Sequence, residues 1–183
     1  MSGIARTIRL ASMAAALLAA AGPRLAAQAV PLPDLKAAFV ANFAKFTEWP
    51  AGPADRSFTF CVTGDAAVAT ALKDLVEKHN FAVVNLSPLA SDDALRNCQV
   101  LYLGGVDEKR MAQMLAAVGG APVFTVGDAE HFAERGGVAQ LILEKDRMRF
   151  AINTDAVQRA HLQLSAKLLT LAVIVKDGGN ASR

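Results

Sequence analysis

Three short turns carry the side chains that are best placed for chemistry. Each turn follows an apolar, strand-like run and contains glycine and an aspartate: Thr63-Gly64-Asp65, Gly104-Gly105 with Asp107, and Gly127-Asp128. Turns of this kind lie where a strand gives way to a helix, the edge at which open α/β sheets usually bind ligands. A structural interpretation competes with this one, because aspartates also cap helices and glycines also make turns. Neither G-x-G-x-x-G nor G-x-x-x-x-G-K-[ST] occurs, so a nucleotide cofactor has no direct support.

The histidines offer little for catalysis or metal binding. His79, His131 and His161 are scattered, with no H-E-x-x-H motif and no nearby carboxylate pair, so we expect no metal site. His161 and Ser165 stand one helical turn apart and could form a hydrogen bond. A serine nucleophile requires a sharp G-x-S-x-G turn and an oxyanion hole, whereas Ser165 lies inside a predicted helix. We therefore expect no catalytic residue and no cofactor.

Two cysteines, Cys61 and Cys98, lie on apolar segments. In an oxidising compartment an even pair of this kind predicts one disulfide. Closing a loop of about 38 residues would remove roughly 4 kcal/mol of unfolded-chain entropy. Two buried free thiols are the alternative, because the sequence does not show how close the two α carbons come.

An aromatic stripe marks the first helix of the predicted fold. Phe39, Phe43, Phe46 and Trp49 recur at three- and four-residue spacing. Such a stripe either packs into the core or remains partly exposed as a surface for a partner or a second subunit.

A polar stripe marks the last predicted helix. Arg159, Gln163, Lys167 and Thr170 share one face of an otherwise apolar segment. This face is either solvated or meets a partner or an anion, with Arg159 as a fork-shaped donor. His161 belongs to the same segment.

Alternating elements predict the architecture that positions these residues. Apolar runs predict strands at 57–63, 81–86, 99–103 and 122–126, followed by an antiparallel hairpin at 138–143 and 147–153. Helical spacing predicts helices at 33–48, 65–79, 107–118, 129–135 and 155–175. The fold class is α/β: a three-layer sandwich with a mixed, mostly parallel sheet, a C-terminal hairpin and a long final helix.

The first 29 residues have the pattern of a secretory signal peptide. Arg6 and Arg9 precede an apolar run from Leu10 to Ala21, and Ala27-Gln28-Ala29 supplies a small-x-small cleavage site. Twelve apolar residues cover about 18 Å, too short for a permanent membrane anchor. We expect cleavage after Ala29, a periplasmic location, and one domain over residues 30–183.

Removing this segment changes the charge of the protein. The full chain has 19 Lys and Arg against 17 Asp and Glu. Arg6, Arg9 and Arg24 leave with the signal peptide, so the mature chain has 16 basic and 17 acidic residues. No cluster of basic and aromatic residues occurs either, so we do not expect nucleic-acid binding.

Several segments, taken in order and spacing, resemble a known family. They are Ala37–Phe39 with Asn42–Pro50, Cys61–Gly64, Cys98–Leu101, Phe124–Asp128, Gly136–Val138, Arg149–Asn153 and Arg159–Ala172. Together they resemble the YfiR family over essentially all of residues 35–175. The resemblance implies a non-enzymatic periplasmic regulator that binds the sensor domain of a YfiN-like membrane diguanylate cyclase and inhibits it. Cyclic di-GMP would fall, and biofilm formation with it.

The resemblance also implies further partners. A YfiB-like outer-membrane lipoprotein can sequester such an inhibitor, members are described as dimers, and Cys61 and Cys98 match a disulfide of the pattern. Some relatives carry a second cysteine pair around Ala133 to Leu143, which this chain lacks. We expect the segments with Phe39, Phe43, Phe46 and Trp49 and with Arg159, His161 and Lys167 to bind the partner.

A small-ligand receptor is the alternative function. In this interpretation Arg159 and His161 help to bind an anionic or aromatic molecule at the sheet edge. A ligand-dependent melting shift of the mature protein would distinguish a pocket from a pure binding surface.

Overall fold

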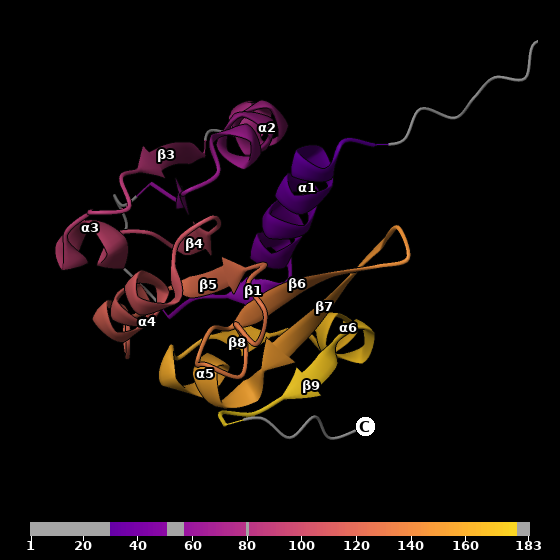
Figure 1. The fold of residues 1–183 in the computed structure, drawn as a ribbon. Coiled ribbons are helices and arrows are strands. Elements are labelled where there is room, and N and C mark those ends of the chain that lie inside the picture. The colour runs from indigo at the N-terminus through magenta and orange to yellow at the C-terminus, as the bar shows by residue number, and fades with distance from the viewer. Residues whose placement is uncertain (1–29, 51–56, 80, 179–183) are drawn as a thin grey trace, which may run out of the picture.

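The computed structural model describes residues 30–50, 57–79 and 81–178, with helices packed against a central sheet (Figure 1). The predicted signal peptide, residues 1–29, lies outside the described residues. The helices are α1 (Leu32–Lys45), α2 (Ala66–Val76), the 3-10 turn η1 (Glu77–His79), α3 (Asp92–Arg96), α4 (Glu108–Ala117), α5 (Thr154–Arg159) and α6 (Ala166–Leu171). The strands are β1 (Thr47–Glu48), β2 (Thr59–Thr63), β3 (Ala82–Leu86), β4 (Val100–Leu103), β5 (Phe124–Gly127), β6 (Ala139–Glu144), β7 (Arg147–Asn153), β8 (Gln163–Leu164) and β9 (Val173–Val175).

In the described part of the chain, the main sheet has seven strands in the order β3-β2-β4-β5-β6-β7-β9. Neighbouring strands from β3 through β6 run parallel, β7 is antiparallel to β6, and β9 is parallel to β7. A separate antiparallel pair joins β1 to β8. The predicted mixed, mostly parallel sheet and the predicted hairpin, β6–β7, are both confirmed.

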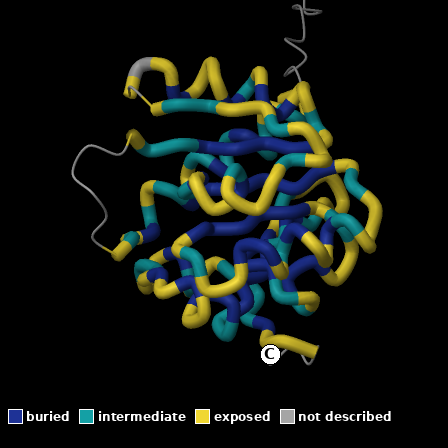
Figure 2. Tube along the Cα trace, turned by 90° about the vertical axis from the view of Figure 1, so that its left-hand side faces the viewer, coloured by how far each residue is buried: buried dark blue, intermediate teal, exposed yellow. Residues whose placement is uncertain are grey.

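The sheet separates two apolar clusters, because successive side chains of a strand point to opposite faces. Phe60, Val62 and Tyr102 pack with buried residues of α1 and α2. Leu101 and Leu103 pack on the other side with residues of α3 and α4. The central strands β4 and β5 are buried along their whole length, as continuous apolar runs predict (Figure 2).

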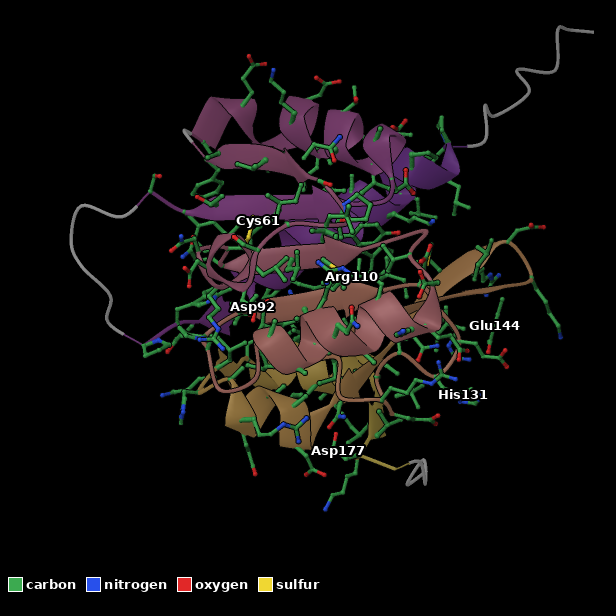
Figure 3. The ribbon with its side chains drawn as sticks, turned by 60° about the vertical axis from the view of Figure 1, so that its left-hand side comes forward. Cys61, Asp92, Arg110, His131, Glu144 and Asp177 are labelled. Carbon is green, nitrogen blue, oxygen red and sulfur yellow. A yellow bond between two sulfur atoms is a disulfide. The ribbon has the colours of Figure 1, made fainter. Side chains whose placement is uncertain are left out.

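Cys61 and Cys98 form a disulfide, as expected for an oxidising compartment (Figure 3). Their α carbons are 5.8 Å apart, within the range that a disulfide spans. Both residues are buried beside Leu95 and Leu101 in the cluster under α3 and α4. The bridge ties β2 to the segment that enters β4.

The predicted long final helix is wrong: residues 155–175 form α5, β8, α6 and β9 instead. His161 has a φ of +54°, which no right-handed helix contains. Ser165 then caps a new helix, its hydroxyl accepting a hydrogen bond from the Leu168 N–H. The apolar run at 173–175 pairs with β7 because β-branched Val-Ile-Val suits a strand as well as an apolar helix face.

A second predicted helix, residues 129–135, is also wrong. The structure has turns over residues 130–135, with His131 at a φ of +58°. The ring of Phe132 fills the space above Gly127 and Gly137, at a position where any Cβ would collide with it. The segment is therefore held by this packing together with turn hydrogen bonds, such as those from Phe132 N to Ala129 O and from Arg135 N to His131 O.

Candidate functional site

The three glycine and aspartate turns lie side by side, because β2, β4 and β5 are parallel neighbours. Asp65 caps α2 by accepting a hydrogen bond from Val68 N at 3.1 Å. Asp107 caps α4 by accepting one from Arg110 N at 2.9 Å. For these two aspartates the structural interpretation is confirmed.

The strand order reverses between β2 and β4, since the chain leaves β2 for the outer strand β3 and returns to β4. Ligands of open α/β sheets bind in the crevice at such a point. Here two turns meet backbone to backbone: a Cβ on Gly64 would lie 1.6 Å from the carbonyl oxygen of Gly104. Gly64 also has a φ of +79°. The backbones of the two turns thus occupy the space between β2 and β4 at which a ligand would otherwise bind.

A charged cluster covers the same edge of the sheet. Lys36 of α1 lies 2.5 Å from Asp128 and 3.7 Å from Asp65, and its side chain is only 14% exposed. The hydroxyl of Tyr102 donates to Asp128 at 3.1 Å. Burial, followed by the charge and the hydrogen bond of Asp128, raises the pKa of Tyr102 far above its usual value, so it stays a neutral donor. The cluster ties α1 to the carboxyl ends of the strands.

Sequence reasoning missed Lys36 and Tyr102. One signal for Lys36 was available, because it stands four residues before Val40 and seven before Phe43, on the apolar face of α1. A lysine on that face requires carboxylate partners, and the aspartates of the turns supply them. Tyr102 lies in a wholly apolar strand, where nothing local indicates a polar contact.

Most of the aromatic stripe packs in the core. Phe43 is 1% exposed; its ring lies 5.4 Å from that of Phe124 and 5.1 Å from that of Phe150. Phe39 is half-buried against the same Phe150 ring. Trp49 packs edge-on against Phe58 at 5.0 Å. Phe46 differs, because its ring contacts the closing segment of the chain.

The strand pair β1–β8 brings the two ends of the fold together. Thr47 pairs with Leu164, and Ser165 N donates to the carbonyl of Phe46 at 2.9 Å. The ammonium group of Lys167 lies 5.6 Å from the centre of the Phe46 ring, a cation–π contact. Residues 45–48 and 163–165 line a shallow depression of about 160 Å³ here. We call this region, with Lys45, Phe46, Glu48, Gln163 and Lys167, the β1–β8 surface.

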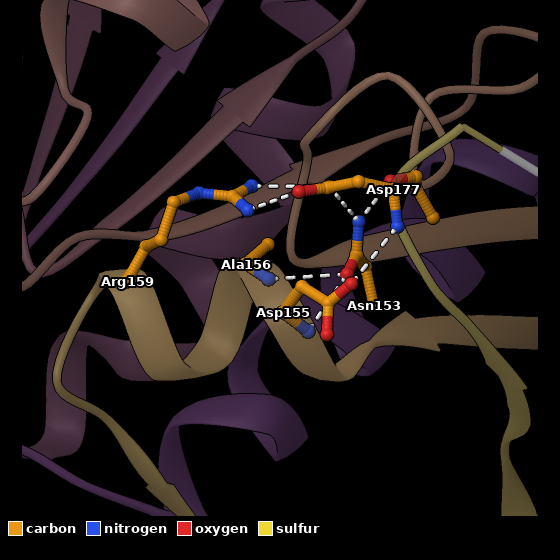
Figure 4. Close-up of polar contacts among 6 residues, drawn as sticks. Asn153, Asp155, Ala156, Arg159 and Asp177 are labelled. Atoms are coloured by element: carbon orange, nitrogen blue, oxygen red, sulfur yellow. Dashed lines mark hydrogen bonds and ion pairs between the residues drawn. The ribbon is translucent and has the colours of Figure 1, made fainter.

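Arg159 does not share a face with Lys167, because it belongs to α5 and Lys167 to α6. The guanidinium of Arg159 forms an ion pair with Asp177, just after β9 (Figure 4). The hydrogen bond from Arg159 is the main reason that the pKa of Asp177 lies below its usual value. The predicted polar stripe is therefore wrong, and Arg159 serves as an anchor for the C-terminal segment.

Asn153 completes this anchor from inside the protein (Figure 4). It is 0% exposed, and its amide NH₂ donates to Ala133 O at 2.6 Å and to Asp177 at 2.7 Å. Its oxygen accepts hydrogen bonds from the N–H groups of Asp155 and Ala156, which caps α5. All the hydrogen-bonding groups of this buried side chain are thus used in structural contacts.

His161 and Ser165 are not one turn apart on a single helix. His161 is exposed in the turn between α5 and β8, whereas the Ser165 hydroxyl caps α6. The structure thus removes the geometry on which a serine and histidine pair would depend. Within the described ranges no three His, Cys, Asp or Glu side chains are grouped to hold a metal, and no helix is long and apolar enough to span a membrane.

An apolar cleft of about 270 Å³ lies between α1 and α2, at the opposite end of the strands from the glycine turns. Its walls are mostly aromatic and small apolar side chains, including Ala38, Ala41, Phe58, Phe60 and Phe81. Asn42 and His79 add polar groups to the lining. Such a cleft fits a small apolar or aromatic molecule.

Comparison with known proteins finds one matching family model and solved structures of similar fold. Residues 33–173 match the model of a family described as YfiR/HmsC-like. A crystal structure of a conserved domain protein from Vibrio cholerae is similar in fold, with a TM-score of 0.57 and 14% identity. That match covers 81% of this chain and 61% of the other.

A substrate binding protein with adhesive properties from Clostridium difficile, in its ligand-free, open form, is also similar. Its TM-score is 0.50 at 14% identity, with 68% of this chain and 56% of the other covered. This chain therefore corresponds to less than two thirds of either solved protein, and the likeness concerns the fold.

Proposed function

The chain belongs to the YfiR/HmsC-like family, and we propose that it is a periplasmic regulator that binds and inhibits the sensor domain of a membrane diguanylate cyclase. The family is one of periplasmic regulators of diguanylate cyclase signalling. On this proposal the precursor is cleaved after Ala29, and the mature protein acts by binding rather than by catalysis. A YfiN-like cyclase is the proposed target, and a YfiB-like lipoprotein the proposed competitor.

The convergence of two distant segments at the β1–β8 surface carries the proposal. The opening helix and the closing segment both lie within the residues that match the family model, and Phe46 and Lys167 from these segments are in contact. A partly exposed aromatic ring offers apolar area of the kind enriched in interfaces, and the lysines beside it add charge that can steer an acidic partner. Glu48 and Gln163 are exposed around it and can add hydrogen bonds at the rim.

Inhibition requires only a difference in affinity between two states of the cyclase. A regulator that binds the inactive state 100-fold more tightly shifts the equilibrium by about 2.7 kcal/mol. The β1–β8 pair suits this role, since it joins the end of the opening helix to the closing segment of the chain.

The test is intracellular cyclic di-GMP in the source bacterium after deletion of the gene. We expect cyclic di-GMP to rise on deletion and to fall again when the secreted form is restored. No change, with a partner cyclase present and expressed, would contradict the proposal.

A charge reversal tests the surface itself. Lys167→Glu should leave cyclic di-GMP high, whereas the matched reversal Lys109→Glu, on exposed α4, should restore it fully. Equal restoration by both variants at equal protein levels would place the binding surface elsewhere.

The second candidate function is a small-ligand receptor, which the apolar cleft between α1 and α2 favours. The cleft replaces Arg159 and His161 as the candidate binding region, since Arg159 is held by Asp177. Screening aromatic molecules for a melting shift, with a bulky Ala41→Trp variant as the blocked control, tests this function. A shift of equal size in both proteins would exclude the cleft.

A further inference from the structure

The cleft between α1 and α2 exists because one face of α1 carries small side chains. Ala38, Ala41 and Lys45 follow one another at spacings of three and four residues, so they share a face of the helix, and all three line the cleft. The two alanines leave space between α1 and α2, which pack side by side (Figure 1). The cleft, of about 270 Å³, is slightly smaller than the pockets of about 300–1,000 Å³ that hold drug-sized ligands, so it suits a compact molecule.

Three phenylalanine rings form an aromatic wall of this cleft. The ring of Phe58 lies 5.1 Å from that of Phe60 and 5.2 Å from that of Phe81, and the last two lie 5.9 Å apart. These contacts hold the wall in place without a ligand, and an aromatic ligand can add edge-to-face contacts to it. Phe81 is 40% exposed and Leu75, also in the lining, is 47% exposed. A ligand that covers them removes apolar surface from water, which favours binding.

The polar side chains of the cleft give it a positive character. They are Asn42 and Lys45 of α1 and His79 of η1, and no Asp or Glu among the described residues lines the cleft. Within the described part of the chain, no hydrogen bond or ion pair engages these three side chains. Lys36, earlier in the same helix, differs because it has two carboxylate partners. The cleft therefore offers hydrogen-bond donors and a positive charge that the protein itself leaves unused.

We propose that this cleft binds a small monocarboxylate with an apolar body, the carboxylate meeting Lys45 and the apolar body meeting the phenylalanine rings. The inference rests on the second candidate function, the small-ligand receptor, and names its ligand class. The ammonium group of Lys45 only donates hydrogen bonds and a carboxylate only accepts them, and Asn42 and His79 can donate to the same oxygens. A positive group on the ligand would be repelled by Lys45. The cleft therefore prefers simple carboxylic acids to amino acids of the same size.

Lys45 also borders the β1–β8 surface. It is the last residue of α1, and it lines both the cleft and the depression of about 160 Å³ beside Phe46. A carboxylate bound in the cleft neutralises a charge that this surface otherwise presents to an acidic partner. A ligand in the cleft thus changes the electrostatics of the surface that we propose for partner binding.

Three probes with one carbon skeleton test the ligand class. They are 3-phenylpropanoate, its neutral amide 3-phenylpropanamide, and L-phenylalanine, which adds an ammonium group to the carboxylate. In an NMR titration of the mature protein, 3-phenylpropanoate should shift the amide signals of Phe58, Phe60 and Phe81 with a Kd of about 1 mM or below. It should bind at least about threefold more tightly than either of the other two probes, because only it gains from the charge of Lys45 without repulsion.

A neutral replacement of Lys45 tests which group selects the charge. Lys45→Met removes the ammonium group and keeps an unbranched apolar side chain, so it should lower the affinity for 3-phenylpropanoate to that for the amide. The affinity for the amide itself should not change. Lys109→Met, on the exposed side of α4, is the matched control and should keep the preference for the carboxylate. A preference that survives in Lys45→Met would overturn the inference.

The outcomes also separate this inference from the receptor function on which it rests. Equal binding of the carboxylate and the amide, abolished in Ala41→Trp, would overturn the ligand class and retain a receptor for apolar molecules. The same conclusion would follow if 3-phenylpropanoate shifted no signal at about 10 mM while another aromatic molecule gave a melting shift that Ala41→Trp removes. Binding of 3-phenylpropanoate that Ala41→Trp leaves unchanged would overturn the inference by excluding the cleft.

Discussion

At the residue scale, the space around a backbone matters as much as its conformation. Gly64 and Gly120 have nearly the same φ, +79° and +75°. A Cβ on Gly64 would collide with the carbonyl of Gly104, whereas a Cβ on Gly120 would meet nothing within 4 Å. The first glycine is required by a close approach of two turns, and the second only by its left-handed conformation.

The two glycines therefore form a matched pair of substitutions. Gly120→Ala should destabilise the protein by about 1–2 kcal/mol, the cost of left-handed backbone for a residue with a Cβ. Gly64→Ala should cost about 2–4 kcal/mol, because the turns must also move apart. Urea denaturation of both variants measures the difference. Equal losses would show that the two turns separate without resistance.

At the element scale, the sequence predicts the strands and hairpin well, but not the final segment. Continuous apolar runs identify β4 and β5 because both sides of these strands are buried. The same periodicity fails after Arg159, where α5 ends, since an apolar run fits a helix and an edge strand equally well. His161, with a φ of +54°, prevents the helix from continuing, and a histidine in the sequence does not by itself predict that conformation.

The candidate site likewise has some contacts that the sequence predicts and others that it does not. The turn aspartates and the disulfide could be predicted, because each depends on local pattern or on cysteine count. The contact of Lys167 with Phe46 and the ion pair of Arg159 with Asp177 could not. Both depend on how distant segments pack, and for Arg159 on a helix that ends earlier than its sequence suggests.

The strained turn between α5 and β8 gives a test at this scale. His161→Gly should increase the free energy of unfolding by up to about 1 kcal/mol, because glycine adopts the left-handed conformation without the Cβ penalty. His161→Ala removes the imidazole but retains the strain, and should show no gain. Chemical denaturation compares the two. A gain in the alanine variant as well would mean that the ring, not the backbone, is unfavourable.

At the scale of the whole molecule, the C-terminal anchor holds the last strand on the sheet. Asp177 accepts hydrogen bonds from Arg159 and from buried Asn153, and these interactions join α5, β7 and the end of the described chain. They require the carboxylate form, because both partners donate. The anchor therefore makes stability depend on pH.

The sign follows from the lowered pKa of Asp177 in the folded protein. The unfolded chain, with a carboxyl near 3.8, binds the proton more readily, so this contribution is complete above that pH and is lost as pH falls through the folded-state pKa. Asp177→Asn should be less stable than the wild type at pH 7, and the difference should shrink in acid below about pH 4.

Urea denaturation at both pH values measures this dependence. Asp74→Asn, on the exposed side of α2, is the control and should follow the wild type at both. A difference between Asp177→Asn and the wild type that stays constant with pH would contradict the role of the charged form.

The position of α1 has a consequence for how the protein is made. Phe43, in the first helix of the described chain, packs against Phe124 and Phe150, and Thr47 pairs with Leu164. A chain that emerges from its N-terminus therefore presents this aromatic helix long before its partners exist, and contacts so distant in sequence form slowly. Until nearly all of the chain has been synthesised, α1 is exposed without its packing partners and can aggregate. We therefore expect α1 to be a segment to which a chaperone binds.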